Sequence, residues 1–159
     1  MMKNQLELAQ NIIEIYKKHA RAWTELRGNV LYEKAWLDHF LARIPQHSKI
    51  LDLGCGSGKP IADYLIQHDH KITGVDSSDV MIEMARQNFP EQHWLQADMR
   101  IVELDQKFNA ILAWDSFFHL TPNDQRQMFR QFARLAQQGT VLMFSSGPSH
   151  GEAIGDLFG

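Results

Sequence analysis

Apolar residues recur at helical spacing along the first part of the chain. One set, spaced by three or four positions, consists of Leu6, Ala9, Ile13, Tyr16 and Ala20. This spacing predicts an amphipathic helix, which Gly28 and Asn29 end. A second helix is predicted over residues 30–44, and its inward face is expected to consist of Leu31, Ala35, Trp36, Phe40 and Ile44. Pro45 stops this helix, so two helices precede the first strand.

Beyond Pro45 the pattern changes to short apolar runs that alternate with helical segments. Five runs are predicted strands: 49–53, 71–75, 93–96, 108–114 and 140–144. The predicted helices among them are 59–67, 79–88 and 122–136. Brief strands that are apolar at nearly every position and joined by crossover helices are typical of a parallel sheet covered on both faces. We therefore expect a doubly wound, Rossmann-like α/β fold with a mostly parallel sheet.

The length of the chain fits a single domain. With 159 residues, of which 44% are hydrophobic, the chain can bury one core. We expect this domain to occupy residues 1–159, with the two helices in 1–45, the α/β core in 46–147 and a tail in 148–159. No apolar run approaches the roughly 18 residues that span a bilayer, so we expect no membrane partner.

The charge of the chain argues against nucleic acid as a partner. Sixteen Lys and Arg against 19 Asp and Glu give a net charge of −3, which would not attract a phosphate backbone. Cys55 is the only cysteine and the N-terminus shows no signal-peptide pattern, which together indicate a cytoplasmic protein. The eight histidines form no ligand pair at helical spacing, so we expect no metal.

Glycine is concentrated at the end of the first predicted strand. Residues 51–58 read Leu-Asp-Leu-Gly-Cys-Gly-Ser-Gly, and a helix is predicted directly after them. Glycines at a strand-to-helix turn let the backbone turn sharply and let a ligand lie against the main chain. The sequence therefore predicts a ligand site at Gly54, Gly56 and Gly58, with Cys55 between them.

The residues around these glycines narrow the choice of ligand. A phosphate-binding P-loop would need Lys followed by Ser or Thr, but Pro60 follows Lys59. A dinucleotide-binding loop would place its third glycine one residue later than Gly58. Asp52, just before the loop, would repel a pyrophosphate but could hold an ammonium group. These features favour S-adenosylmethionine (SAM), which carries an ammonium and a sulfonium and no phosphate.

Two further acids follow the next two predicted strands. Asp76 ends the second strand, where a carboxylate can accept both hydroxyls of a ribose. Asp98 follows the third strand, where it could accept the exocyclic amine of adenine. Because the carboxyl ends of parallel strands form one rim, we expect Asp52, Asp76 and Asp98 to surround one ligand. Three acids suit a cationic nucleoside without phosphate.

In these motifs and in their order, residues 49–147 resemble the class I SAM-dependent methyltransferases. Residues 50–58 are similar to the family's first motif, 75–76 to its ribose motif and 97–99 to its adenine motif. Residues 108–115 resemble its fourth motif, which lines the methyl-transfer site. The resemblance implies SAM as cofactor and S-adenosylhomocysteine (SAH) as product.

The resemblance also implies which residues contact the cofactor. They are Gly54, Gly56, Asp76, Met81, Asp98 and Met99, and we add Asp52, Cys55, Gly58, Ser77 and Trp114, which lie in or beside the same motifs. Residues 16–27 are similar to the helical cap of small bacterial members, whose aromatic and basic residues close over cofactor and substrate. The expected cap residues are Tyr16, Trp23 and Arg27.

The segment after the fourth predicted strand could supply a general base. Methyl transfer from a sulfonium depends mainly on placing the acceptor, because the leaving group is neutral. An acceptor hydroxyl or ammonium must also lose a proton. Asp115 and His119, among three aromatic residues, are the expected catalytic residues, and an apolar setting would bring both pKa values towards neutrality. The alternative is that His119 is a structural histidine.

The end of the chain departs from the resembled family, which closes its sheet with two further strands. Residues 145–159, after the fifth predicted strand, show no strand pattern. We therefore expect a shortened family member in which a second copy of the chain covers the edge of strand 140–144. The segment that is expected to be missing usually helps to shape the acceptor pocket, so cofactor binding could survive without catalysis.

Three functions stay open at this point. The first is a SAM-dependent methyltransferase (EC 2.1.1.-) that acts on a small-molecule acceptor. The second is a SAM- or SAH-binding protein without turnover, and the third is an NAD(P)-dependent oxidoreductase. The sequence does not identify the acceptor or the atom that is methylated.

Overall fold

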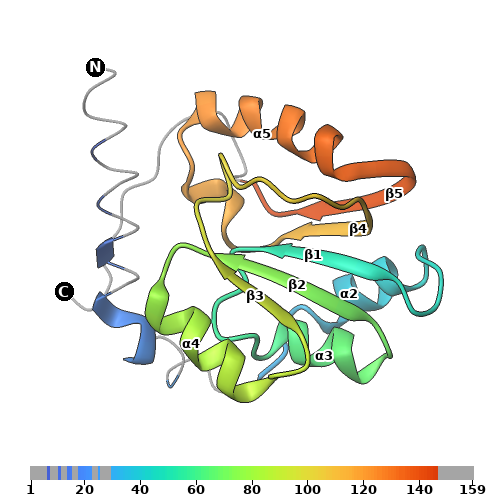
Figure 1. The fold of residues 1–159 in the computed structure, drawn as a ribbon, viewed down its shortest axis with the longest axis horizontal. Coiled ribbons are helices and arrows are strands. Elements are labelled where there is room, and N and C mark those ends of the chain that lie inside the picture. The colour runs from blue at the N-terminus through green and yellow to red at the C-terminus, as the bar shows by residue number, and fades with distance from the viewer. Residues whose placement is uncertain are drawn as a thin grey trace.

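The computed structural model of the chain describes residues 7, 11, 14, 15, 18–22, 25 and 30–146. All the described residues before residue 26 are helical, as the apolar spacing of this segment predicts. In Figure 1 they are the blue ribbon at the left of the view.

Five parallel strands form one sheet in the order β3-β2-β1-β4-β5. They are β1 (Lys49–Leu53), β2 (Lys71–Asp76), β3 (His93–Gln96), β4 (Phe108–Ala113) and β5 (Ala136–Phe144). Leu53 of β1 lies opposite Val75 of β2, and Asp76 lies opposite Gln96 of β3. The carboxyl ends of the strands therefore share one edge of the sheet, at the left in Figure 1. The predicted five-strand sheet is confirmed.

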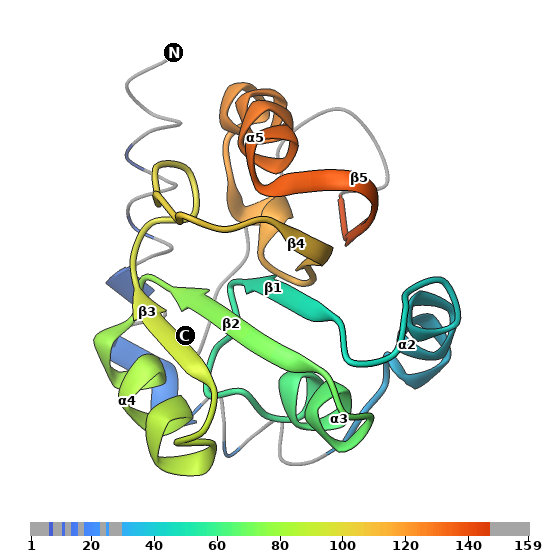
Figure 2. The same cartoon turned by 45° about the vertical axis from the view of Figure 1, so that its right-hand side comes forward.

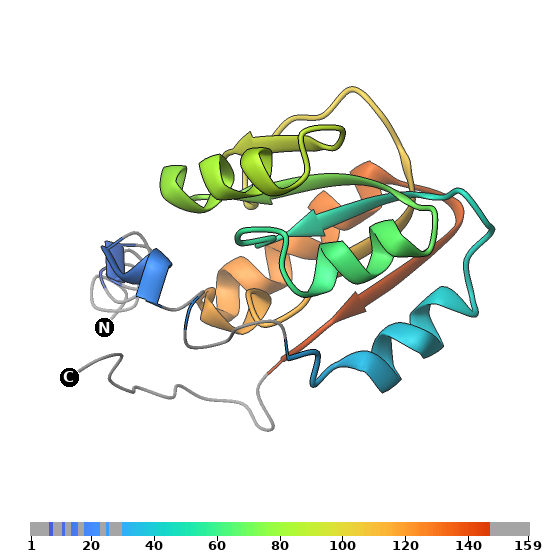
Figure 3. The ribbon, with the colours of Figure 1, turned by 90° about the horizontal axis from the view of Figure 1, so that it is seen from below.

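Helices cover both faces of this sheet. They are α2 (Lys34–Leu41), α3 (Ile61–Gln67), α4 (Asp79–Asn88) and α5 (Pro122–Leu135), with a short 3₁₀ helix, η1 (Phe117–His119), before α5. Figure 2 shows α2, α3 and α4 on one face and α5 on the other, and Figure 3 shows the same layers from below. The chain therefore has the doubly wound α/β fold that its sequence predicts.

Neighbouring residues of each strand supply two separate apolar cores, because successive side chains point to opposite faces of a sheet. Ile50 of β1 and Leu112 of β4 are buried in the core under α2, α3 and α4. Leu51 and Ile111, one position away in each strand, are buried in the core under α5. The buried positions of the central strands are thus mostly apolar, with Asp52 of β1 as a charged exception.

Side-chain caps place the starts of two helices. The hydroxyl of Ser78 accepts a hydrogen bond from the backbone N–H of Met81 at 3.2 Å and begins α4. Thr121 accepts in the same way from Asp124 at 3.1 Å, with Pro122 in the first turn of α5. These are the residue types that favour a helix start, and both helices begin where the sequence predicts.

The second helix is shorter than predicted, and its predicted inward face is confirmed only in part, at Phe40, Leu31 and Ile44. α2 ends at Leu41, and Arg43 and Ile44 then bond to carbonyls three residues back, which tightens the chain ahead of Pro45. Leu37 and Phe40 face the sheet, whereas Ala35 is exposed and Trp36 is 59% exposed. The short helix can bury only one narrow stripe, and Trp36 lies outside it.

The fifth strand begins earlier than predicted. It starts at Ala136, directly after α5, and Ala136 pairs with Phe108. The register then shifts, so that Val141 pairs with Ala110, and Gly139 within the irregular stretch has a φ of +84°. Residues 137–139 are polar or glycine, so their sequence pattern is that of a loop, and they form the irregular stretch between the two paired parts of β5.

Candidate functional site at the carboxyl edge of the sheet

The glycine loop connects β1 to α3 at the point where the strand order reverses. β1 has β2 on one side and β4 on the other, and in doubly wound sheets ligands bind at this switch point. The backbone N–H groups of Gly54 and Cys55 both donate to the carbonyl of Val75, at 2.7 and 3.1 Å. The loop is thereby attached to the end of β2 as well as to β1.

Two of the loop glycines have different reasons to be glycine. A Cβ at Gly54 would lie 2.3 Å from the Cβ of Ser116, so the segment after β4 packs directly on the loop there. Gly56 has a φ of +56°, and the nearest atom to a Cβ there is Sδ of Met81, at 3.9 Å. A Cβ would therefore meet only Met81 at Gly56, at ordinary contact distance, and it is the positive φ that favours glycine there.

Asp76 ends β2 and faces the glycine loop. Its Oδ2 accepts the backbone N–H of Gly56 and its Oδ1 accepts that of Ser78, both at 2.9 Å. Burial raises the pKa of Asp76 more than these two hydrogen bonds lower it. A carboxylate has about four acceptor positions, so Asp76 keeps about two of them for a pair of hydroxyl donors.

Asp52 is the most deeply buried acid of the site. Its side chain lies within β1 and is 4% exposed. Burial, and the nearby charge of Asp76, raise the pKa of Asp52 to about 7, and no hydrogen bond from a described residue offsets them. A buried carboxylate of this kind gains most from a cation that can reach it.

Asp98 follows β3 and forms an ion pair with Arg100. Nη2 of Arg100 lies 2.6 Å from Oδ2 of Asp98. Burial alone would raise the pKa of Asp98, but the hydrogen bonds and the charge of Arg100 outweigh it and lower the pKa. Asp98 is therefore an ionised acceptor, as the sequence predicts, but with a partner that the sequence did not indicate.

The segment after β4 lies across the same edge of the sheet. The hydroxyl of Ser116 donates to the carbonyl of Leu53 at 2.8 Å, and the backbone N–H of Asp115 donates to Oγ of Ser145 at 2.7 Å. Burial lowers the pKa of His119, so its imidazole is neutral at pH 7. Asp115 itself is exposed, so the apolar setting expected for both residues is found only at His119.

Three other residues were predicted to contact the cofactor: Met99, Cys55 and Ser77. The Cε of Met99 lies 3.5 Å from the position of a Cβ on Gly54. The side chain of Cys55 is buried against the sheet, and burial raises the pKa of its thiol. The backbone carbonyl of Ser77 accepts a hydrogen bond from Nε2 of Gln96 at 3.4 Å.

The last of these cofactor predictions is Trp114, at the end of β4. Its ring centroid lies 6.3 Å from that of Trp36, and it packs against the core under α2. The predicted cap residues Tyr16, Trp23 and Arg27 lie outside the described residues.

Two residues of the site were not predicted from the sequence. Ser116 supports the glycine loop only because β4 lies beside β1 in space. Arg100 is important because its side chain reaches α5, 24 residues further on. The signal that could have found Arg100 is its place two residues after an acid at a strand end.

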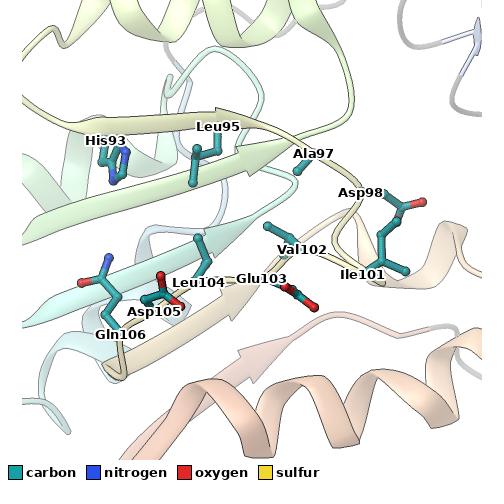
Figure 4. Close-up of a pocket in the computed structure, with 10 residues that line it drawn as sticks. All are labelled: His93, Leu95, Ala97, Asp98, Ile101, Val102, Glu103, Leu104, Asp105 and Gln106. Carbon is teal, nitrogen blue, oxygen red and sulfur yellow. The ribbon is translucent and has the colours of Figure 1, made fainter.

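A separate cavity of about 710 Å³ lies along β3, on the face that α5 covers. Leu95 of β3 and Leu104, in the segment between β3 and β4, point toward one another across it (Figure 4). Ala97 and Asp98 line its end nearest the site, but no residue of the glycine loop does. This cavity is therefore separate from the glycine loop.

The described part of the chain has neither a cluster of metal ligands nor a membrane-spanning helix. No three His, Cys, Asp or Glu side chains there are grouped as metal ligands. Within the same residues, no helix has the length and the apolar character that a membrane crossing requires.

Known proteins show sequence similarity to this chain over most of its length. A family model described as a methyltransferase domain matches residues 50–139, more than half of the chain. The Bacillus subtilis protein YqeM, named for a proposed methyltransferase activity, is 32% identical over 136 residues, which cover 82% of this chain and 54% of YqeM. A dTDP-4-amino-2,3,4,6-tetradeoxy-D-glucose N,N-dimethyltransferase of Saccharopolyspora spinosa is 27% identical over 131 residues, 81% of this chain and 50% of that enzyme. This chain thus spans about half the length of these two relatives.

Solved structures show the same fold. The crystal structure of a TehB-like SAM-dependent methyltransferase from Corynebacterium glutamicum matches with a TM-score of 0.65 and 26% identity. The match covers 91% of this chain and 76% of that one.

Proposed function

Because this chain belongs to the class I SAM-dependent methyltransferases, we propose that it transfers a methyl group from SAM to a small-molecule acceptor. One observation carries the proposal. The half-buried Asp76 accepts the backbone N–H of Gly56 and keeps acceptor positions for a ligand, and the buried Asp52 lies near enough for its pKa to be raised by the charge of Asp76. That arrangement suits a ligand with one ammonium and two neighbouring hydroxyls, and it disfavours a pyrophosphate.

The residues of the site fit SAM part by part. We assign the ammonium of its amino-acid tail to Asp52, because a cation would compensate the buried charge there. We assign its ribose hydroxyls to the acceptor positions that remain on Asp76. The adenine amine is assigned to Asp98, with Met81 and Met99 beside the loop as apolar contacts.

The bound cofactor supplies a methyl group on a sulfonium, and the protein supplies position and a proton acceptor. Holding an acceptor atom in line with that methyl can lower the barrier by about 7–11 kcal/mol. Where the acceptor is a hydroxyl or an ammonium, we propose that a ring nitrogen of His119 receives its proton. The neutral imidazole that burial enforces is the form able to do so.

The class of acceptor is proposed from the relatives as a group. One of them is named for an amino sugar and another, an Azoarcus protein, for trans-aconitate. Both names denote small molecules, and the net charge of −3 offers no attraction to nucleic acid. The single buried, unpaired cysteine supports a cytoplasmic location, which we propose as well.

Two measurements test the proposal in turn. Calorimetric titration with SAM, SAH, NAD and NADP should show binding of the first two only. Formation of SAH over a panel of hydroxyl, amine, thiol and carboxylate acceptors should then identify turnover. Binding without turnover over a broad panel would favour a SAM-binding protein, and binding of NAD in place of SAM would favour an oxidoreductase.

A further inference from the structure

Arg100 holds the carboxylate of Asp98 with three separate N–H groups. Its backbone N–H donates to Oδ1 at 2.9 Å, its Nε lies 3.0 Å from both oxygens, and its Nη2 donates to Oδ2 at 2.6 Å. Both side chains are 26% exposed, so the pair lies at the surface of the site without being fully solvated. A planar guanidinium in this arrangement fixes the orientation of a carboxylate as well as its charge.

Helix α5 holds this pair in place. Nη1 of Arg100 donates to Oδ2 of Asp124 at 3.1 Å, and Asp124 lies in the first turn of α5. Further along the helix, the buried Gln131 donates Nε2 to the carbonyl of Val102 at 2.7 Å. The segment that carries Asp98 is therefore attached to α5 on both sides of Arg100. Asp98 cannot turn without breaking these bonds.

The carboxylate of Asp98 has few hydrogen-bond acceptor positions left for a ligand. An ionised carboxylate offers about four acceptor positions, and the three N–H groups of Arg100 occupy most of them. The position that remains can accept one N–H. It repels a carbonyl oxygen, because two acceptors would then face each other without a proton between them.

We propose that Arg100 is a positioning residue that makes the adenine end of the site selective. By fixing Asp98 as an acceptor for a single N–H, it favours a 6-aminopurine nucleoside over a 6-oxopurine nucleoside. The inference rests on the proposed function, because it requires the purine of the cofactor to reach Asp98. A merely structural Arg100 would stabilise the segment and would affect both purines equally.

The test compares two ligands that differ at this one group. The dissociation constants of SAH and of S-inosylhomocysteine, its 6-oxopurine analogue, are measured by calorimetry for the wild type and for three variants. Arg100→Met removes the charge and all side-chain donors. Arg100→Lys keeps the charge but not the planar fork. Arg130→Met, which changes an exposed arginine of α5 and leaves the contacts of Arg100 in place, is the matched control.

The wild type is expected to bind SAH at least tenfold more tightly than the inosyl analogue. In Arg100→Met that preference should fall to within about threefold, through weaker binding of SAH and unchanged binding of the analogue. Arg100→Lys should lose part of the preference, and Arg130→Met should keep all of it. An unchanged preference in either folded Arg100 variant would overturn the inference and leave the proposed function intact. A wild type that binds neither ligand would overturn both.

Discussion

Asp52 lies where its negative charge is unfavourable until a cation reaches it. Its carboxylate is buried within β1 and close to that of Asp76. A residue selected for stability alone would be neutral at this position. The cost of this carboxylate is therefore best explained by ligand binding, and stability and binding should respond in opposite directions when it is changed.

Asp52→Asn should stabilise the unliganded protein and weaken SAM. The folded-state pKa is raised from 3.8 to about 7, so the stability linked to protonated Asp52 is full below 3.8 and is lost as pH rises through about 7. At pH 8 the variant should be more stable by on the order of a few kcal/mol, with little difference at pH 4. Urea unfolding at both pH values measures this, and calorimetry should show SAM binding roughly tenfold or more weaker. A variant that is destabilised at pH 8 would contradict the account.

Asp76→Ala should weaken SAM by about 1.5–3 kcal/mol, the range for hydrogen bonds to a charged group. The reason is that its remaining acceptor positions are assigned to the ribose. Asp105→Ala, which changes an exposed acid away from the loop, is the control and should leave the dissociation constant unchanged. Equal affinities of the wild type and Asp76→Ala would remove Asp76 from the site.

At this scale the sequence predicts residues whose chemistry is local and misses those that act through a partner. The glycines and the acids Asp52 and Asp76 follow directly from the ends of strands, where they were expected. Ser116 and Arg100 were missed because their partners, Leu53 and Asp124, come from other parts of the chain. Neither contact has a spacing that a single sequence reveals.

Among the elements, the starts of β1 and β2 are joined by a buried histidine. Nδ1 of His70 accepts the backbone N–H of Ser48 at 3.1 Å. Burial is the main cause that lowers the pKa of His70, and the charges of His68 and His47 nearby lower it further. Protonation would therefore remove the acceptor and place a charge in the core at the same time.

The stability that His70 provides should be full above pH 6.5 and should be lost as pH falls toward its lower folded-state pKa. His70→Asn keeps an acceptor at the position of Nδ1 but does not titrate, so this part of the pH dependence should disappear. Urea unfolding between pH 5 and 7.5 measures the slope, with the exposed His93→Asn as control. Identical slopes for the wild type and His70→Asn would contradict this role.

The elements that sequence patterns placed well are those with local signals. α4 begins at a capping serine, and β1 and β3 have the predicted bounds. The start of β5 was missed because Ala136 joins the sheet by pairing with Phe108 of β4, ahead of an irregular polar stretch, which is a tertiary effect. The face of α2 was predicted only in part because the apolar Trp36 was expected to be buried, and it is not.

For the molecule as a whole, the edge of β5 that no other described strand covers raises the question of a partner. Within the described residues β5 pairs only with β4, and residues 141–144 are all partly exposed. An apolar edge strand favours pairing with another chain, and we propose a second copy as that partner. Sedimentation of this 159-residue chain should give a mass near twice 18.4 kDa. A monomer at all concentrations tested would contradict the proposal.

A crystal structure of the protein with SAH would show directly where the cofactor lies. SAH should lie against Gly56, with its ribose hydroxyls on the carboxylate of Asp76 and its amino group directed to Asp52. Density for SAH in the cavity along β3, or its absence from crystals grown with saturating SAH, would show that the cofactor does not bind at the glycine loop.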